Sequence, residues 1–209
     1  KTQVNTNLYF MNYKDQLVLT GEIDEEGAAI RKNSGESYRL GLEVDATIWV
    51  NDWLSLRPNI AISRNRNKDF IAVFDGIRQN FGDTEISFSP NVVAGNMIRL
   101  SPIKNLQLNL LSKYVGEQYM SNLELETSKL DSYFVNDFNV QYTIETESFF
   151  KSIVLSGLGN NIFDAKYISN GYYYTYDVGN DDGSTTTFDG AGYYPQAGIN
   201  FLVGATITF

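Results

Sequence analysis

The last eleven residues of the chain alternate between two kinds of side chain, and this alternation constrains the fold more than any other feature. On an extended strand successive side chains point to opposite faces of the sheet. One face would carry only apolar residues: Ile199, Phe201, Val203, Ala205, Ile207 and Phe209. The other would carry Asn200, Leu202, Gly204, Thr206 and Thr208. Soluble antiparallel sheets can also have one apolar face, so a single strand does not identify the fold class. The number of strands that repeat the pattern does.

Seven earlier segments repeat the alternation, which predicts eight strands in all. They cover residues 4–19, 38–50, 54–63, 87–100, 106–113, 134–144 and 152–163. The first is expected to continue through Leu17 and Leu19. Within the segment 54–63, Pro58 is the one residue that cannot donate to a ladder. The polar faces hold many Asn, Ser, Thr and Gly residues besides charged ones: Arg39, Glu43, Asp45, Arg57, Arg99, Lys113 and Asp137.

The connections between these segments alternate between long and short. Short turns are predicted near Asn51, Pro102 and Glu147, and long loops over residues 22–36, 64–85, 117–132 and 164–197. Outer-membrane barrels have this layout, with all short turns at one end and an apolar outer band on tilted strands. A soluble β-sandwich or solenoid remains the alternative, but nothing in such folds sorts connections by length.

Aromatic residues gather toward both ends of the predicted strands, as in the two aromatic girdles of a membrane barrel. The short-turn end has Trp49, Trp53, Phe149, Phe150 and Phe209. The loop end has Tyr114, Tyr119, Tyr133, Tyr167 and the group from Tyr172 to Tyr176.

Composition excludes several function classes. The 209 residues include no Cys and no His, which removes disulfides, thiolate nucleophiles, imidazole bases and the commonest zinc ligands. The formal net charge of −9 disfavours a nucleic-acid partner, and no run approaches the ~18 apolar residues of a membrane helix. Glu43 and Asp45 share one face, which lumen hydrogen bonding explains better than acid–base catalysis. We therefore expect no enzyme, no cofactor and no metal.

Four stretches resemble a known family. They are N-N-I-F-D-A-K-Y at residues 160–167, the final sixteen residues from Tyr194, L-Y-F-M-N-Y-K-D-Q-L-V-L-T-G at residues 8–21 and S-Y-R-L-G-L-E at residues 37–43. These stretches resemble the C-terminal end of TonB-dependent outer-membrane receptors, especially those of Bacteroidetes. The resemblance covers nearly all of residues 1–209.

The resemblance implies an all-β fold: an antiparallel transmembrane β-barrel of about 22 strands, of which residues 1–209 form about eight C-terminal strands. It implies an outer-membrane location in a Gram-negative bacterium and uptake of a scarce nutrient such as a siderophore or cobalamin. The implied partners are the rest of the barrel and its plug domain, the TonB complex, the barrel-assembly machinery, outer-membrane lipid and a small nutrient ligand.

Each unpaired backbone group at a strand edge in hydrocarbon costs several kcal/mol. Eight strands in a membrane therefore need either the further strands of a larger barrel or closure into a small barrel of their own. The alternative interpretation is therefore a complete eight-stranded barrel that acts as an adhesin or an envelope-stabilising protein.

Two sets of residues are candidate functional sites. The loop from Tyr172 to Asp189 could hold a ligand by aromatic stacking or gather cations, through Tyr172, Tyr173, Tyr174, Tyr176, Asp177, Asp181 and Asp182. A solvated loop with interfacial tyrosines is the other interpretation, and a calcium loop fails because Val178 would occupy the first ligand position. The resemblance also implies an assembly signal at Phe201, Val203, Ala205, Ile207 and Phe209.

Overall fold

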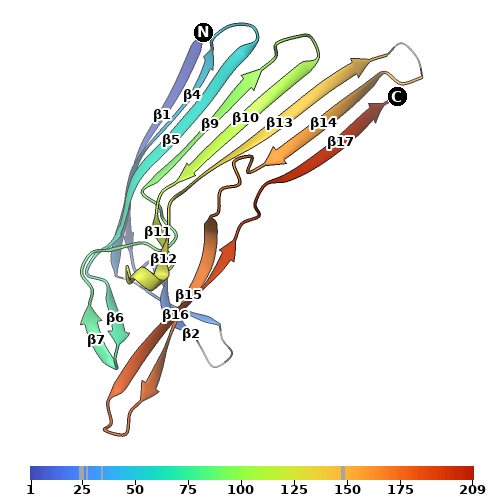
Figure 1. The fold of residues 1–209 in the computed structure, drawn as a ribbon. Coiled ribbons are helices and arrows are strands. Elements are labelled where there is room, and N and C mark those ends of the chain that lie inside the picture. The colour runs from blue at the N-terminus through green and yellow to red at the C-terminus, as the bar shows by residue number, and fades with distance from the viewer. Residues whose placement is uncertain (24–25, 27, 34, 147–148) are drawn as a thin grey trace.

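A computed structural model describes residues 1–23, 26, 28–33, 35–146 and 149–209. Eight long antiparallel strands form one curved wall (Figure 1), in the order β1-β4-β5-β9-β10-β13-β14-β17. Their bounds are β1 Thr2–Lys14, β4 Glu36–Trp49, β5 Leu54–Asn67, β9 Val92–Leu100, β10 Leu106–Val115, β13 Tyr133–Glu145, β14 Ser152–Asn160 and β17 Asn200–Thr208. Within the described residues β1 and β17 pair with one neighbour each and not with each other, so the wall is open.

The register gives the wall one apolar and one polar face, as the alternation predicts. Leu8 lies opposite Leu42, and Leu42 lies opposite Ile62. All three side chains are exposed, because no described part of the chain covers them. On the other face Asn5 Nδ2 donates to Asp45 Oδ2 over 2.8 Å. The apolar face is therefore the outer face, and the polar one the inner face.

Pro58 interrupts the ladder between β4 and β5. Asp45 pairs with Asn59 and Ile48 with Leu56, but the two positions between them form no pairs. Proline has no N–H to donate, which accounts for the gap. On the other side Pro58 stays in register with Asn96 of β9, so the strand order is unaffected.

In the structure, most residues of the longest predicted loops form strands. β2 Leu17–Ile23, β3 Ala29–Asn33, β15 Ile168–Gly179 and β16 Thr185–Pro195 form a second sheet in the order β16-β15-β2-β3. The expected continuation of the first strand to Leu17 and Leu19 is wrong, because Asp15 has a φ of 56° and β2 leaves the wall to pair with β3. The loop predicted over residues 164–197 is mainly the β15–β16 hairpin.

The other long connections carry shorter elements. β6 Ile71–Phe74 pairs with β7 Ile77–Asn80, β8 Thr84–Glu85 pairs with β5, and β11 Gln118–Tyr119 pairs with β12 Lys129–Leu130. A single 3-10 turn, η1 Glu126–Ser128, precedes β12. A buried apolar cluster of Val18, Phe70, Ala72 and Leu123 holds these connections together. The core therefore lies in the connections beyond the wall.

The short turns lie at the opposite end of the wall. Asn51 Oδ1 accepts hydrogen bonds from the backbone N–H of Trp53 and Leu54, which closes the β4–β5 turn. Ser101 to Asn105 closes the β9–β10 turn. The predicted turn at Glu147 lies outside the described residues. Among the described residues no helix is long and apolar enough to cross a membrane.

The two aromatic groups differ in their placement. Phe149, Phe150 and Phe209 form one cluster at the short-turn end, with ring centroids 5.3 to 5.5 Å apart. At the other end Tyr133 stacks on Tyr167 at 4.5 Å. Tyr119 and the group from Tyr172 to Tyr176 lie in the strands beyond the wall, so they are not part of a girdle around it.

Candidate ligand-binding surface

The β15–β16 hairpin presents a continuous row of aromatic rings on one face. Cross-strand register places Tyr172 opposite Gly192, Tyr174 opposite Gly190 and Tyr176 opposite Phe188. Neighbouring ring centroids in the row lie 5.6 to 6.4 Å apart. We call this row the aromatic face; its members are Tyr172, Tyr174, Tyr176, Phe188 and Tyr194.

Two glycines make room for the rings. A Cβ atom at Gly190 would lie 2.7 Å from the Tyr174 hydroxyl oxygen, and one at Gly192 would lie 2.3 Å from the Tyr172 ring. The rings therefore lie across the backbone of the partner strand, an arrangement that only residues without a side chain permit. Tyr172, Tyr176 and Tyr194 each remain about half exposed, so the aromatic face offers flat surfaces for stacking.

Tyr173 belongs to the opposite face of the hairpin. Its ring packs against the buried cluster around Phe70. Burial raises the pKa of the Tyr173 hydroxyl, and the neighbouring Asp189 carboxylate adds to the rise. Among the described residues this buried hydroxyl has no hydrogen-bond partner. The structure therefore separates Tyr173 from the other candidate tyrosines and gives it a packing role.

We predict that Tyr173→Phe leaves the stability of the protein unchanged or raises it by about 1 kcal/mol. The substitution removes a buried polar group without a partner and keeps the ring that packs in the cluster. Thermal unfolding of the wild type and the variant measures the difference. A loss above about 1 kcal/mol would instead indicate that the hydroxyl bonds to a neighbour such as Asp189.

The candidate carboxylates do not gather into one site. Asp177 accepts a 2.6 Å hydrogen bond from the Thr187 hydroxyl, and Asp75 at the β6–β7 turn exchanges two more bonds with Thr187. Asp182 accepts hydrogen bonds from the backbone N–H and the hydroxyl of Ser184, which lower the pKa of its carboxyl group. Asp181 is exposed in the same turn. Within the described ranges no group of three or more acidic, His or Cys residues could hold a metal ion.

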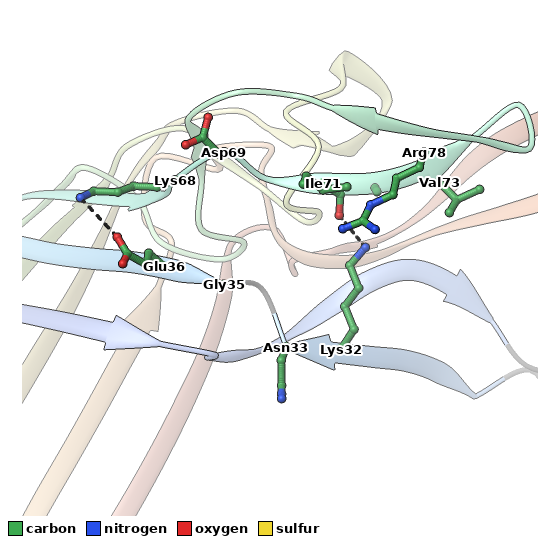
Figure 2. A pocket seen from close by; sticks show the side chains of 10 residues that line it. Lys32, Asn33, Gly35, Glu36, Lys68, Asp69, Ile71, Val73 and Arg78 are labelled. Atoms are coloured by element: carbon green, nitrogen blue, oxygen red, sulfur yellow. Dashed lines mark hydrogen bonds and ion pairs between the residues drawn. The ribbon is translucent and has the colours of Figure 1, made fainter.

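A second surface lies between β3 and the β6–β7 hairpin (Figure 2). This groove of about 590 Å³ is lined by three cations, Lys32, Lys68 and Arg78, and two carboxylates, Glu36 and Asp69. Lys32 Nζ donates to the carbonyl oxygen of Ile71 at 2.7 Å, and Lys68 lies 3.9 Å from Glu36. Sequence reasoning missed the groove because its residues come from two loops that only the folded connections bring together.

The wall has the fold of TonB-dependent receptor barrels. No protein-family model matches the sequence, and no curated protein matches it either. Similarity to solved structures covers almost the whole chain, at sequence identities that establish the fold alone.

Three solved structures illustrate the likeness. The siderophore receptor PiuA from Acinetobacter baumannii matches 98% of this chain with a TM-score of 0.62 and 15% identity. The ferric yersiniabactin uptake receptor FyuA from Yersinia pestis matches 100% with a TM-score of 0.64 and 17% identity. The copper transporter OprC matches 98% with a TM-score of 0.67 and 16% identity. The chain spans only 26%, 28% and 29% of their respective lengths.

Proposed function

We propose that this chain is part of the barrel wall of a TonB-dependent receptor that takes up a scarce nutrient across the outer membrane of a Gram-negative bacterium. One observation carries the proposal: an eight-stranded antiparallel wall with an apolar outer face, a polar inner face and two open edges. Solved receptors contain the same wall as about a quarter of their length. The protein is then a transport receptor and not an enzyme.

The open edges favour a large barrel over the alternative of a complete eight-stranded adhesin. β1 and β17 lie at opposite ends of the strand order, and each leaves one row of backbone groups without a partner among the described residues. In a bilayer these groups need further strands of the same barrel. The remaining partners in the proposal are a plug domain, the TonB complex, the barrel-assembly machinery and outer-membrane lipid. The C-terminal sequence motifs support a Bacteroidetes type.

The aromatic face is the proposed contact for the nutrient. PiuA is named as a siderophore receptor, FyuA as a ferric yersiniabactin uptake receptor and OprC as a copper transporter, so the shared fold does not by itself determine the ligand. Stacked, half-exposed rings favour a ligand with flat ring faces, such as an aromatic siderophore, a cobalamin or a sugar. Asp181 and Asp182 beside this face would add negative potential that attracts cationic groups.

A binding screen on the complete receptor tests this function. Siderophores, cobalamin, peptides and glycans are each presented to the receptor, and we expect one class to be retained selectively. Replacing Tyr172, Tyr174 and Tyr176 together by Ala should weaken that binding about tenfold or more, because each stack contributes about 0.5–1.5 kcal/mol. The matched control is Tyr173→Phe, which should keep wild-type affinity.

Two outcomes would count against the proposal in different ways. If no ligand class is retained, nutrient uptake is not supported. If the triple variant binds as tightly as the wild type, the ligand is held elsewhere in the receptor and the aromatic face is not its contact.

A further inference from the structure

The turn of the β6–β7 hairpin contacts the β15–β16 hairpin, which carries the aromatic face. Asp75 and Gly76 form this turn, with φ angles of 54° and 69°. Positive φ at both central residues is typical of a type I′ turn, for which Asp-Gly is a preferred pair. The turn is therefore short, and it holds the backbone of Asp75 in one orientation.

Asp75 and Thr187 exchange hydrogen bonds between their backbones and side chains. The backbone N–H of Asp75 donates to the Thr187 hydroxyl at 2.7 Å, and the backbone N–H of Thr187 donates to Asp75 Oδ1 at 2.8 Å. The Thr187 hydroxyl in turn donates to Asp177 Oδ1 at 2.6 Å. We call these three bonds the clasp. It joins two connections across a separation of 112 residues in the sequence.

The clasp lies at one edge of the second sheet. β16 comes first in the order β16-β15-β2-β3, so one of its sides has no neighbouring strand among the described residues. The turn of the other hairpin approaches β16 closely, because Gly76 has no side chain. A Cβ atom there would lie 3.0 Å from the Cβ atom of Thr185.

The clasp holds the hairpin from behind the aromatic face. Thr187 lies directly opposite Asp177, and each is next in sequence to a residue of the aromatic face, Phe188 and Tyr176. Since successive side chains on a strand point to opposite faces, the clasp and these two rings lie on opposite faces of the hairpin. The two ring centroids are 5.6 Å apart.

A second contact holds the same rear face nearer to the wall. The Thr127 hydroxyl of η1 donates to the Asp189 carboxylate, and the Tyr193 hydroxyl donates to the carbonyl oxygen of Thr127 at 3.1 Å. This contact secures the base of the hairpin. The clasp therefore decides how the outer half of the hairpin is held.

We propose that Asp75 and Thr187 are positioning residues: the clasp fixes the outer half of the β15–β16 hairpin in the orientation in which the aromatic face accepts its ligand. The inference rests on the proposed function, in which this face contacts the nutrient. A hairpin that is already held from behind need not be ordered by the ligand, which favours binding. Without the clasp only a fraction of the receptors would have this orientation, and the apparent Kd would rise in inverse proportion to that fraction.

Hydrogen exchange of the complete receptor without ligand tests whether the clasp fixes the hairpin. Thr187→Val keeps the shape of the side chain and removes two of the three bonds. Exchange over residues 185–189 should become at least about fivefold faster, the effect of two lost hydrogen bonds. Thr187→Ser keeps the hydroxyl and should exchange like the wild type. Thr186→Val is the matched control, because the Thr186 hydroxyl accepts its hydrogen bond from Asn180 of the same hairpin.

Binding of a ferric catecholate siderophore, a probe with flat rings, tests the effect on the aromatic face. If Thr187→Val leaves the binding orientation populated about a fifth of the time, its Kd should be about fivefold higher than that of the wild type. Thr187→Ser and Thr186→Val should keep wild-type affinity.

A reversible disulfide separates positioning from a general loss of stability. The reciprocal bonds bring the backbones of Asp75 and Thr187 close enough for the double variant Asp75→Cys, Thr187→Cys to form one. The oxidised form should have wild-type exchange and affinity. The reduced form should behave like Thr187→Val, because it has lost the clasp and has no bond in its place.

The proposal is overturned if Thr187→Val exchanges like the wild type over residues 185–189. It is also overturned if the oxidised and reduced forms of the double variant bind the siderophore equally well. That second result keeps the proposed ligand contact and removes the positioning role. A wild-type receptor that retains no siderophore fails the proposed ligand contact instead, and the exchange measurement still decides whether the clasp fixes the hairpin.

Discussion

Placing an arginine at Val203 is expected to lower the free energy of unfolding of the proposed receptor by about 2–4 kcal/mol, the cost of a cation on the lipid face near the bilayer midplane. Val203 lies on the outer face of β17, opposite Gly157 of β14, and its side chain is 92% exposed. Thr206, on the inner face of the same strand, is the matched control. Arginine there contacts a wet interior, and we expect a change within about 0.5 kcal/mol.

Urea unfolding of the receptor in lipid vesicles measures both variants. Equal costs at the two positions, or a larger cost at Thr206, would contradict the assignment of the faces. The outer face of β17 also carries the residues of the predicted assembly signal, from Phe201 to Phe209. Folding yield should therefore be measured separately from the free energy of unfolding.

Replacing Arg66 by Met is expected to cost about 2–3 kcal/mol and to detach the connection between β10 and β13 from β5. Arg66 lies 3.3 Å from Glu85 and 2.6 Å from Glu124. Without its guanidinium the two carboxylates would face each other with no cation between them. Removing one partner of a buried ion pair typically costs about 3–5 kcal/mol, and Arg66 is 24% exposed, which reduces the effect.

Hydrogen exchange of the backbone near Glu124, together with thermal unfolding, measures this loss. Lys104→Met is the control, because its ion pair with Glu145 is largely exposed and is worth under about 1 kcal/mol. Similar small effects in both variants would show that Arg66 does not hold the connection in place.

The wall could be predicted from local pattern because its side chains follow the pleat. Period two identifies the inner and outer residues of each strand, and the alternation of short and long connections gives the neighbour order. Pro58 shows where this reasoning stops. Its missing N–H marks a gap in a ladder, but only the structure shows that the gap faces β4 and leaves β9 in register.

The strands beyond the wall could not be predicted in the same way. The two-residue period of a strand was present in this stretch, which was interpreted as a loop. Its alternating residues are Tyr172, Tyr174 and Tyr176 on one side and Tyr173, Thr175 and Asp177 on the other. Which side of that alternation is buried depends on Phe70 and Leu123, which are far away in the sequence. The acids near the hairpin turn are close in sequence, but their partners differ, so proximity along the chain did not make a cluster.

The parallel pairing of β2 with β15, at positions 22 and 175, has a consequence for biogenesis. The β2–β3 hairpin is synthesised long before the β15–β16 hairpin with which it pairs. Contacts between positions so distant in the sequence form slowly. In the proposed receptor the second sheet, in the order β16-β15-β2-β3, is therefore expected to reach its final form only after β15 is available to pair with β2. Because the aromatic face belongs to this sheet, the proposed ligand binding is expected to appear only after this pairing has formed.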